Sequence, residues 1–330
     1  MNPNIHRSLA ALGAFGALAL GTAPSVVLAQ AFPNKPVKVI AAYPTGSGPD
    51  AVLRVVGDKL TKMWGQQILI ENKPTANGLV AGEQAKRSPA DGYTLLMMDD
   101  AHLNANPRLY KQMPYDTVKD FEPIARLYQT YFFFVVPANA PWKTMPEFIA
   151  AARAKGDKFT YGSWGIGSVG HLGVVAFENA TGLNMTHIPF QGVTLLYPAI
   201  GNNEVDWGFG TVASSGAVAR SGKIRYLAAA APKRVVGYHD IPTIAEAGGQ
   251  ADFEVRSWVA ILAPRGLPPA ISAQLNADIN KTLADADVRD RLATMGFEPM
   301  PSTPAEIAQA IESGGKRLGG LIERAKISLD

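Results

Sequence analysis

The chain has 330 residues, 47% of them apolar and 18% charged, which is enough apolar material for a folded protein of two lobes and excludes a disordered chain. Lys and Arg number 31 against 28 acidic residues, and no basic run stands out, so nothing indicates a nucleic-acid-binding protein. Cysteine is absent, which excludes disulfides, thiolate metal sites, a cysteine nucleophile and a lipid-modified N-terminal cysteine.

Residues 1–29 are typical of a secretory signal peptide. Arg7 precedes an uncharged apolar run at 8–20, and small-residue exits end at Ala29 and at Ala31. A membrane-spanning helix needs about 20 apolar residues, so this run is short for one, although a retained anchor is the alternative. We expect cleavage after Ala29 or Ala31 and a periplasmic protein that is not lipid-anchored.

The chain then alternates short apolar strands with amphipathic helices. The spacing predicts strands at 37–42, 67–71 and 93–98, separated by helices at 50–63 and 78–86. Further strands are predicted at 132–137, 159–162, 185–188 and 258–264, with helices starting near Met145, Ser168 and Pro269. This alternation predicts an α/β fold whose mainly parallel sheets are covered by helices.

Two of these strands, at 132–137 and 258–264, are alike: each is followed by a Pro-marked turn and a helix. We expect the chain to cross between two lobes at these strands, and two crossings make a hinge. Lobe one is then 32–130 plus 262–330, and lobe two is 131–261. One continuous α/β domain is the alternative.

The first candidate ligand site is the glycine-rich turn at 43–50, between the first strand and its helix. Glycine lets the backbone approach a ligand closely, and Pro49 suits the first helical position, which places Gly48 near the N-cap. A helix N-terminus attracts anions through its free N–H groups and its dipole. The expected donors are those of Thr45, Gly46, Ser47 and Gly48.

A second turn of this kind follows the strand at 159–162, with Ser168 as the expected N-cap of the next helix. If both turns face one cleft, backbone donors grip a dianion from two sides without Lys or Arg. Residues 165–170 also match G-x-G-x-x-G, but the strand at 185–188 lacks the acidic residue that a dinucleotide site needs.

Catalytic and metal-binding motifs are absent from the sequence, and its histidines lack ligand spacing, so we expect no enzyme activity, no cofactor and no metal. The alternative is an exported serine hydrolase that uses Ser47, Ser163 or Ser168 with His102 or His171. The pair at 99–100 is read most simply as a loop cap, since two acids work against an anion site.

Many short segments, taken in order, resemble the Bug family, the extracytoplasmic solute-binding proteins of tripartite tricarboxylate transporters. They are the segments at 32–37, 48–50, 71–74, 90–96, 106–110, 114–116, 161–163, 165–168, 171–172, 187–192 and 241–248. The resemblance runs over essentially all of the chain after residue 31. It implies a two-lobed Venus-flytrap fold that closes over a small carboxylate, a di- or tricarboxylate or an aromatic acid, and delivers it to membrane permease subunits.

Carried onto this chain, the resemblance implies a monomer whose ligand site contains Tyr43, Thr45, Gly46, Ser47, Gly48, Asp100, His102, Ser163, Trp164, Gly165, Ile166, Gly167, Ser168, Phe190, Gln191, Gly192, Asp206 and Thr211. A role as a sensor that feeds a signalling partner fits the same residues.

The second lobe departs from the family pattern at Trp164, Ile166 and Phe190-Gln191. These changes remove polarity or charge, so we expect a ligand with a sizeable apolar or aromatic body rather than citrate. The alternative is that Trp164 only packs on the surface of its lobe.

Overall fold

The computed structural model describes residues 32–329. The predicted signal peptide at 1–29 lies outside these residues. Pro33–Asp330 forms one compact unit. None of its described helices is long and apolar enough to cross a membrane.

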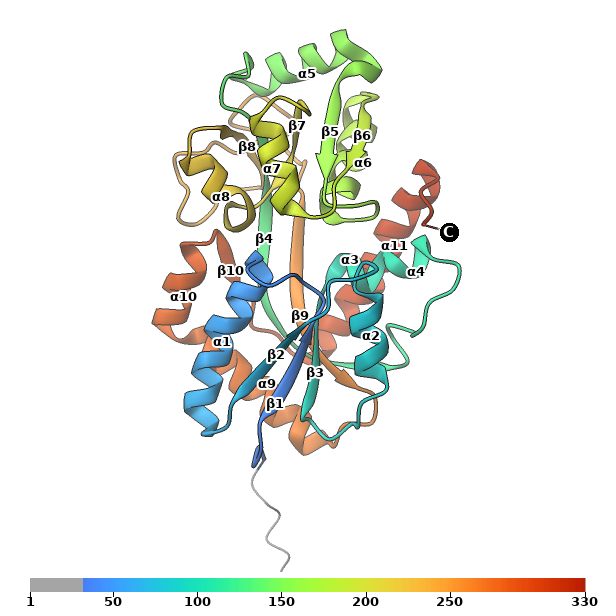
Figure 1. The fold of residues 1–330 in the computed structure, drawn as a ribbon, viewed down its shortest axis with the longest axis vertical. Coiled ribbons are helices and arrows are strands. Elements are labelled where there is room, and N and C mark those ends of the chain that lie inside the picture. Colours follow the sequence, from blue (N-terminus) through green and yellow to red (C-terminus); the bar gives the residue numbers. More distant parts are fainter. Residues whose placement is uncertain (1–31, 330) are drawn as a thin grey trace, which may run out of the picture. The chain divides into compact units, whose positions relative to one another are not determined.

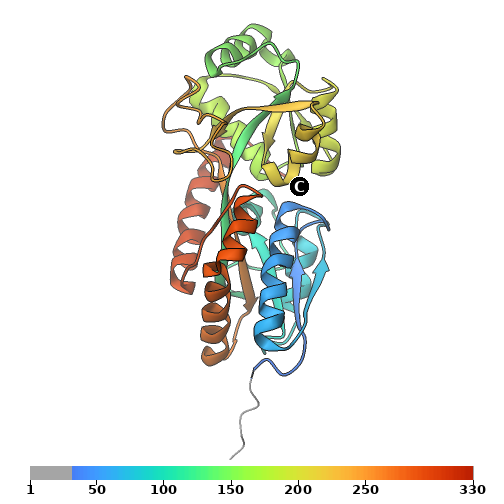
Figure 2. The ribbon, with the colours of Figure 1, turned by 90° about the vertical axis from the view of Figure 1, so that its left-hand side faces the viewer.

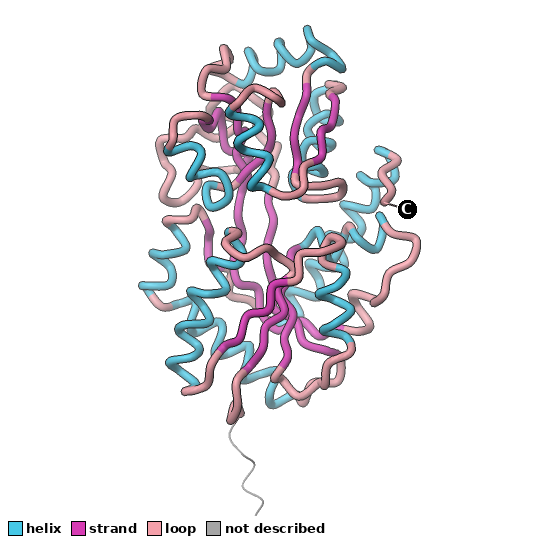
Figure 3. Tube along the Cα trace, viewed as in Figure 1, coloured by secondary structure: helices cyan, strands magenta, loops and turns pink. Residues whose placement is uncertain are grey.

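The helices and strands agree closely with the predicted alternation (Figures 1 and 3). In chain order they are β1 (Val37–Ala41), α1 (Gly48–Trp64), β2 (Ile68–Asn72), α2 (Leu79–Lys86), β3 (Thr94–Asp99), α3 (Asp100–Asn104), α4 (Asn106–Leu109), β4 (Phe121–Pro137), α5 (Met145–Lys155), the 3-10 turn Gly156–Lys158, β5 (Thr160–Ser163), α6 (Val169–Thr181), β6 (Thr186–Pro189), α7 (Val193–Gly201), β7 (Trp207–Gly210), α8 (Val212–Arg220), β8 (Ile224–Ala230), β9 (Arg256–Pro264), α9 (Pro269–Ala284), α10 (Ala286–Ala293), β10 (Phe297–Pro299) and α11 (Pro304–Ala325).

The described strands pair in the order β2-β1-β3-β9-β4-β7-β5-β6, with β8 and β10 also paired to β4. Two sets of neighbours are parallel, β2-β1-β3 and β6-β5-β7. β4 and β9 run antiparallel to each other, because the chain leaves one lobe along β4 and returns along β9. Figures 1 and 2 show these two strands passing from the lower group of elements to the upper one.

β4 belongs to both sheets. Its first part, up to Tyr131, pairs with β9 and β10, and its second part, from Phe132, pairs with β7 and β8. β9 pairs with β3 and β4 from Arg256 onward, so the whole strand lies in the sheet of the first lobe. We therefore propose that the return crossing lies near residue 255 rather than 262.

Each lobe has its own core. In the first lobe, Leu96 and Met98 of β3 pack with Trp258 and Leu262 of β9. In the second, aromatic rings dominate, and Trp207 and Phe134 stack 5.2 Å apart. Burial of so many large apolar side chains fixes the strands, and thereby the loops at their ends.

Candidate functional site

A buried carboxylate organises the first glycine-rich turn, at the carboxyl end of β1. Asp50 is 1% exposed and accepts a hydrogen bond from the Gly46 amide at 2.9 Å. Arg54 donates to both carboxylate oxygens, at 2.9 and 3.1 Å, and Asn72 donates at 2.9 Å. Burial raises the pKa of Asp50, but these hydrogen bonds outweigh burial and keep the pKa below its ordinary value. Asp50 therefore stays ionised and occupies the Gly46 amide.

The hydroxyls of this turn are also engaged inside the protein. Thr45 Oγ1 donates to Asn72 Oδ1 at 3.0 Å, and Ser47 Oγ donates to a backbone carbonyl at 2.7 Å. Ser47, rather than Gly48, is the N-cap of α1. The N–H of Gly48 lies in the first turn of α1, where a helix offers no acceptor of its own. Gly48 is therefore the expected donor that remains available to a ligand.

The second turn, between β5 and α6, is closed by its own hydrogen bonds. The hydroxyls of Ser163 and Ser168 both donate to the carbonyl of Gly165, at 3.0 and 2.7 Å. Ser168 is the N-cap of α6, as predicted. The Gly167 amide donates to His171 Nδ1 at 3.0 Å. This amide, an expected ligand donor, is therefore occupied by a side chain.

Two neutral histidines, His171 and His187, contact this turn through hydrogen bonds. The rings of His171 and His187 stack 4.1 Å apart, and His187 Nε2 lies 2.7 Å from Ser163 Oγ. Burial, and then the neighbouring His187 ring, lower the pKa of His171 to about 3, and burial lowers the pKa of His187 to about 4. Both rings are uncharged near neutral pH, so they position the turn without adding a cation to the site.

The three apolar departures in the second lobe differ in position. The Trp164 ring stacks on Phe132 at 5.8 Å, and Phe190 packs against the second-lobe core. Ile166, at the tip of the turn, is 37% exposed. Trp164 and Phe190 therefore pack on their own lobe and stay partly exposed, whereas Ile166 presents more of its apolar surface.

The two strand edges face each other. A Cβ added to Gly48 of α1 would lie 3.0 Å from the Cβ of Ala213 in α8, which belongs to the second lobe. A Cβ added to Gly167 would overlap Leu109 of α4, in the first lobe. Thr211 is the N-cap of α8, which places it beside the first of these contacts. Each turn therefore lies against the opposite lobe, the start of α1 against α8 and the turn before α6 against α4.

The loop after β3 adds a buried polar group to this edge. Asp99 is the N-cap of α3, and its carboxylate lies 2.6 Å from His102 Nδ1. The edge of the His102 ring meets the ring of Tyr43 at 5.5 Å. Burial, and then the charge of Asp99, raise the pKa of Tyr43. These three residues form one cluster that joins the loops after β1 and β3, and Asp99 caps the helix as expected.

Asp100, next in the chain, is 4% exposed and accepts a hydrogen bond from Ser257 Oγ at 2.6 Å. Burial, and then the charge of Asp99, raise its pKa to about 7. In the unfolded chain the pKa is near 3.9, so the folded protein holds this proton more tightly, and the resulting stability is lost as the pH rises through about 7.

We therefore expect the free energy of unfolding of the wild type, relative to Asp100→Asn, to be about 3 kcal/mol larger near pH 5 than near pH 8.5. Asparagine keeps the size and the acceptor for Ser257, and the difference cancels other titrating groups. Urea unfolding of both proteins at the two pH values measures it. An equal difference at both pH values contradicts the raised pKa.

The structure does not bring Asp206 to this edge. Asp206 precedes β7, at the opposite end from Thr211, where it pairs with Lys155 at 2.7 Å and accepts from the Thr160 amide at 2.9 Å. Its place before an apolar strand is the signal that would have excluded it. Gln191 and Gly192 lie in the turn between β6 and α7, at the same end of the sheet as the turn after β5, because β5 and β6 are parallel.

Leu109 was not singled out as a site residue from the sequence, and Ala213 entered only as the last residue of the segment at 206–213 that the resemblance implies for the wall of the site. Both are ordinary apolar side chains on short or irregular segments, and no local pattern marks them. Their role appears only when the lobes are seen together. Asp50 was seen only as part of a helix start, although a carboxylate three residues after a serine N-cap is a recognised first-turn pattern.

The serines are poorly arranged for hydrolysis. Ser47, Ser163 and Ser168 each donate the hydroxyl proton to a backbone carbonyl, and Ser163 is completely buried. His187, not His102 or His171, is the histidine beside Ser163. Within residues 32–329, no group of three His, Asp or Glu side chains is placed to hold a metal ion.

Comparisons with known proteins show which family the chain belongs to. Residues 52–327 match the model of the tripartite tricarboxylate transporter family receptors. The chain belongs to this receptor family. Among its relatives, BugT of Bordetella pertussis is 30% identical over 99% of both chains, and a UPF0065 protein of Cupriavidus necator is 32% identical over 94% of both chains.

Solved structures of similar receptors confirm the two-lobed periplasmic-binding-protein fold. A Rhodopseudomonas palustris protein solved with adipate has a TM-score of 0.84 and 27% identity, covering 90% of this chain and 99% of its own. MatC from the same species, with bound malate, has a TM-score of 0.78 and 29% identity, covering 88% and 100%. Members of the family are solute-binding receptors rather than enzymes, which overturns the hydrolase alternative.

Proposed function

We propose that this receptor binds a small dicarboxylate between the carboxyl edges of its two parallel strand sets. The contact of Gly48 with Ala213 carries the proposal, because it brings the N-termini of α1 and α8 together across the interlobe space. Each first turn offers N–H groups without helical acceptors, and each dipole favours negative charge. Similar receptors that hold adipate and malate support this ligand class.

The available donors differ from those first expected. Because Gly46 and Gly167 are occupied by Asp50 and His171, the remaining N–H groups are those at the helix starts, including Gly48. Charge-assisted hydrogen bonds contribute about 1.5–3 kcal/mol each, so a few such bonds at each end of a dianion account for a micromolar Kd.

We further propose that the ligand carries an apolar body between its carboxylates. Ile166 is 37% exposed at the tip of the second turn, and Leu195 of α7 is 55% exposed in the same lobe. Neither turn contributes a lysine or arginine to the interlobe space. An apolar spacer would contact Ile166, whereas the central carboxylate and hydroxyl of citrate would find no cation there.

Calorimetric titration with adipate, phthalate, benzoate, malate and citrate tests this function. We expect adipate or phthalate to bind with a Kd on the order of micromolar and citrate to bind at least about tenfold more weakly. Tighter binding of citrate than of the apolar acids would reject the apolar spacer, and no binding of any dicarboxylate would reject the function itself.

Export and delivery complete the proposal. The protein acts in the periplasm after removal of the segment at 1–29, as a monomer, and passes its ligand to permease subunits rather than to a sensor. Closure over the ligand supplies the form that the permease recognises. Uptake of the labelled acid by cells tests delivery. We expect this uptake to require both the receptor and the permease. Uptake that survives deletion of the receptor would contradict it.

A further inference from the structure

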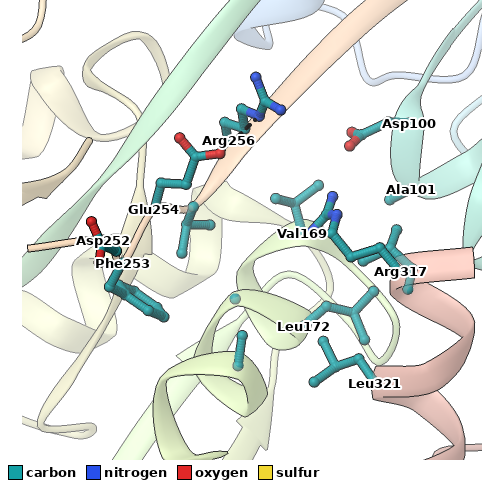
Figure 4. Close-up of a pocket in the computed structure, with 14 residues that line it drawn as sticks. Asp100, Ala101, Val169, Leu172, Asp252, Phe253, Glu254, Arg256, Arg317 and Leu321 are labelled. Carbon is teal, nitrogen blue, oxygen red and sulfur yellow. Dashed lines mark ion pairs between the residues drawn. The ribbon is translucent and has the colours of Figure 1, made fainter. Parts of the chain in front are cut away.

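A cavity of about 310 Å³ shares only Asp100 with the residues of the proposed dicarboxylate site. Figure 4 shows it between α6, α11, the start of α3 and the segment that leads into β9. No residue of the first glycine-rich turn lines this cavity. Its volume falls at the lower end of the range of small-molecule sites in proteins.

One long side of the cavity is apolar. Val169, Leu172 and Ala176 line it from one face of α6, at the spacing of successive helical turns. Leu318 and Leu321 of α11 line it from the opposite side. These side chains come from both lobes, so a molecule bound here would contact both.

The charged residues of the cavity leave one cation available. Arg256 is paired with Glu254 at 3.1 Å. The guanidinium of Arg317 lines the cavity and makes no hydrogen bond or ion pair within residues 32–329. In Figure 4 the Arg317 head lies beside Val169, on the same side of the cavity as Asp100. Arginine binds a carboxylate through two parallel N–H donors.

The acidic residues limit the charge of the occupant. Asp252, Glu254 and Asp100 line the same cavity, against two arginines. Asp100, whose pKa is raised to about 7, holds a proton part of the time near neutral pH and can then donate it to an acceptor. Glu254 is paired with Arg256, and the charge of Arg317 acts on Asp100, whose pKa it lowers. When Asp100 is protonated, Arg317 can pair with one carboxylate of the occupant, whereas a second negative charge would meet the carboxylates of Asp252 and Glu254.

We infer that this cavity is a second ligand site, which takes a monocarboxylate with an apolar body: the carboxylate binds Arg317 and the apolar part lies along Leu172, Ala176 and Leu321. This differs from the proposed dicarboxylate site in both position and ligand charge. The two sites share Asp100, but the residues that define this one, Arg317, Leu172 and Leu321, lie outside the dicarboxylate site, so the inference stands whether or not that function holds.

Isothermal titration of the full-length mature receptor with octanoate and, separately, with 4-methylbenzoate tests the inference. We expect one of the two to bind with a Kd below about 1 mM. Octanedioate, the matched dianion, is a dicarboxylate that the first proposed site can also take, so it is titrated into both wild type and Arg317→Gln, and we expect its affinity to be the same in both. The two probes distinguish a chain-shaped from a ring-shaped apolar body.

Variants test whether the probe binds in this cavity. Arg317→Gln is expected to weaken binding of the preferred probe about tenfold or more, whereas Arg324→Gln, which removes the same charge about two turns further along α11, leaves it unchanged. Ala176→Phe fills the cavity and should abolish binding of the probe. Arg317→Gln changes an exposed side chain, so its fold is preserved and its result stands even if Ala176→Phe fails to fold. Unchanged binding in Arg317→Gln, or no binding of either probe to the wild type, overturns the inference.

Discussion

Replacing Gly48 with valine is expected to weaken dicarboxylate binding by about 10- to 100-fold while the receptor still folds. The new Cβ would lie 3.0 Å from Ala213 across the lobes and 2.9 Å from the Phe297 ring in its own lobe. Overpacking of this kind costs about 1–3 kcal/mol, and here the lobes relieve it by moving apart. The ligand then loses its contacts with one of the two edges.

Matched controls separate the effect of overpacking between the lobes from a general loss of stability. Gly315→Val changes a helical glycine of α11 whose added Cβ would meet no atom within 4 Å, and it should leave binding unchanged. Gly48→Ala combined with Ala213→Gly restores room between the lobes and should recover most of the affinity. Titration calorimetry with the best acid measures each variant, and full affinity in folded Gly48→Val would refute the proposed contact of the lobes around the ligand.

Replacing Asp50 with alanine is expected to lower the free energy of unfolding by about 2–4 kcal/mol. The buried carboxylate accepts from Gly46, Arg54 and Asn72. Its loss leaves the Gly46 amide without its acceptor, and Asn72 Nδ2 keeps only its hydrogen bond to the Tyr43 carbonyl. Arg54 is half exposed, so water solvates the freed guanidinium and limits the loss. Urea unfolding measures the change.

Asp58→Ala is the control, because Asp58 is an exposed acid on the same helix, and its removal should change stability by less than about 0.5 kcal/mol. Asp50→Asn keeps the size and one acceptor but loses the charge, so it should fall between wild type and Asp50→Ala. If Asp50→Ala costs less than about 1 kcal/mol, the turn is held by something other than this carboxylate.

Local sequence patterns were sufficient to place most of the predicted strands and helices at the right residues. Apolar periodicity and cap residues are local properties, and the structure places β1, β3, β5 and α6 within a residue or two of the predicted ranges. The first part of β4 was not predicted because Glu122, Pro123 and Arg126 interrupt its apolar pattern, and it is a strand through pairing with β9 and β10.

The candidate site was predicted as a set of loops but not as a set of donors. Glycine and proline mark the turns, and the order of strands places those turns at one edge. Which amides stay available depends on side chains brought in by the fold, as Asp50 and His171 are brought to Gly46 and Gly167. Contacts between the lobes, such as Gly48 with Ala213, involve residues without a chemical signature.

A crystal structure of the receptor with adipate, or with whichever acid binds tightest, measures the central claim directly. We predict one carboxylate within hydrogen-bond distance of the turn that begins α1 and the other within that distance of the turn that begins α6 or α8. An acid found away from both edges, or held by one lobe alone in a closed receptor, would contradict the account.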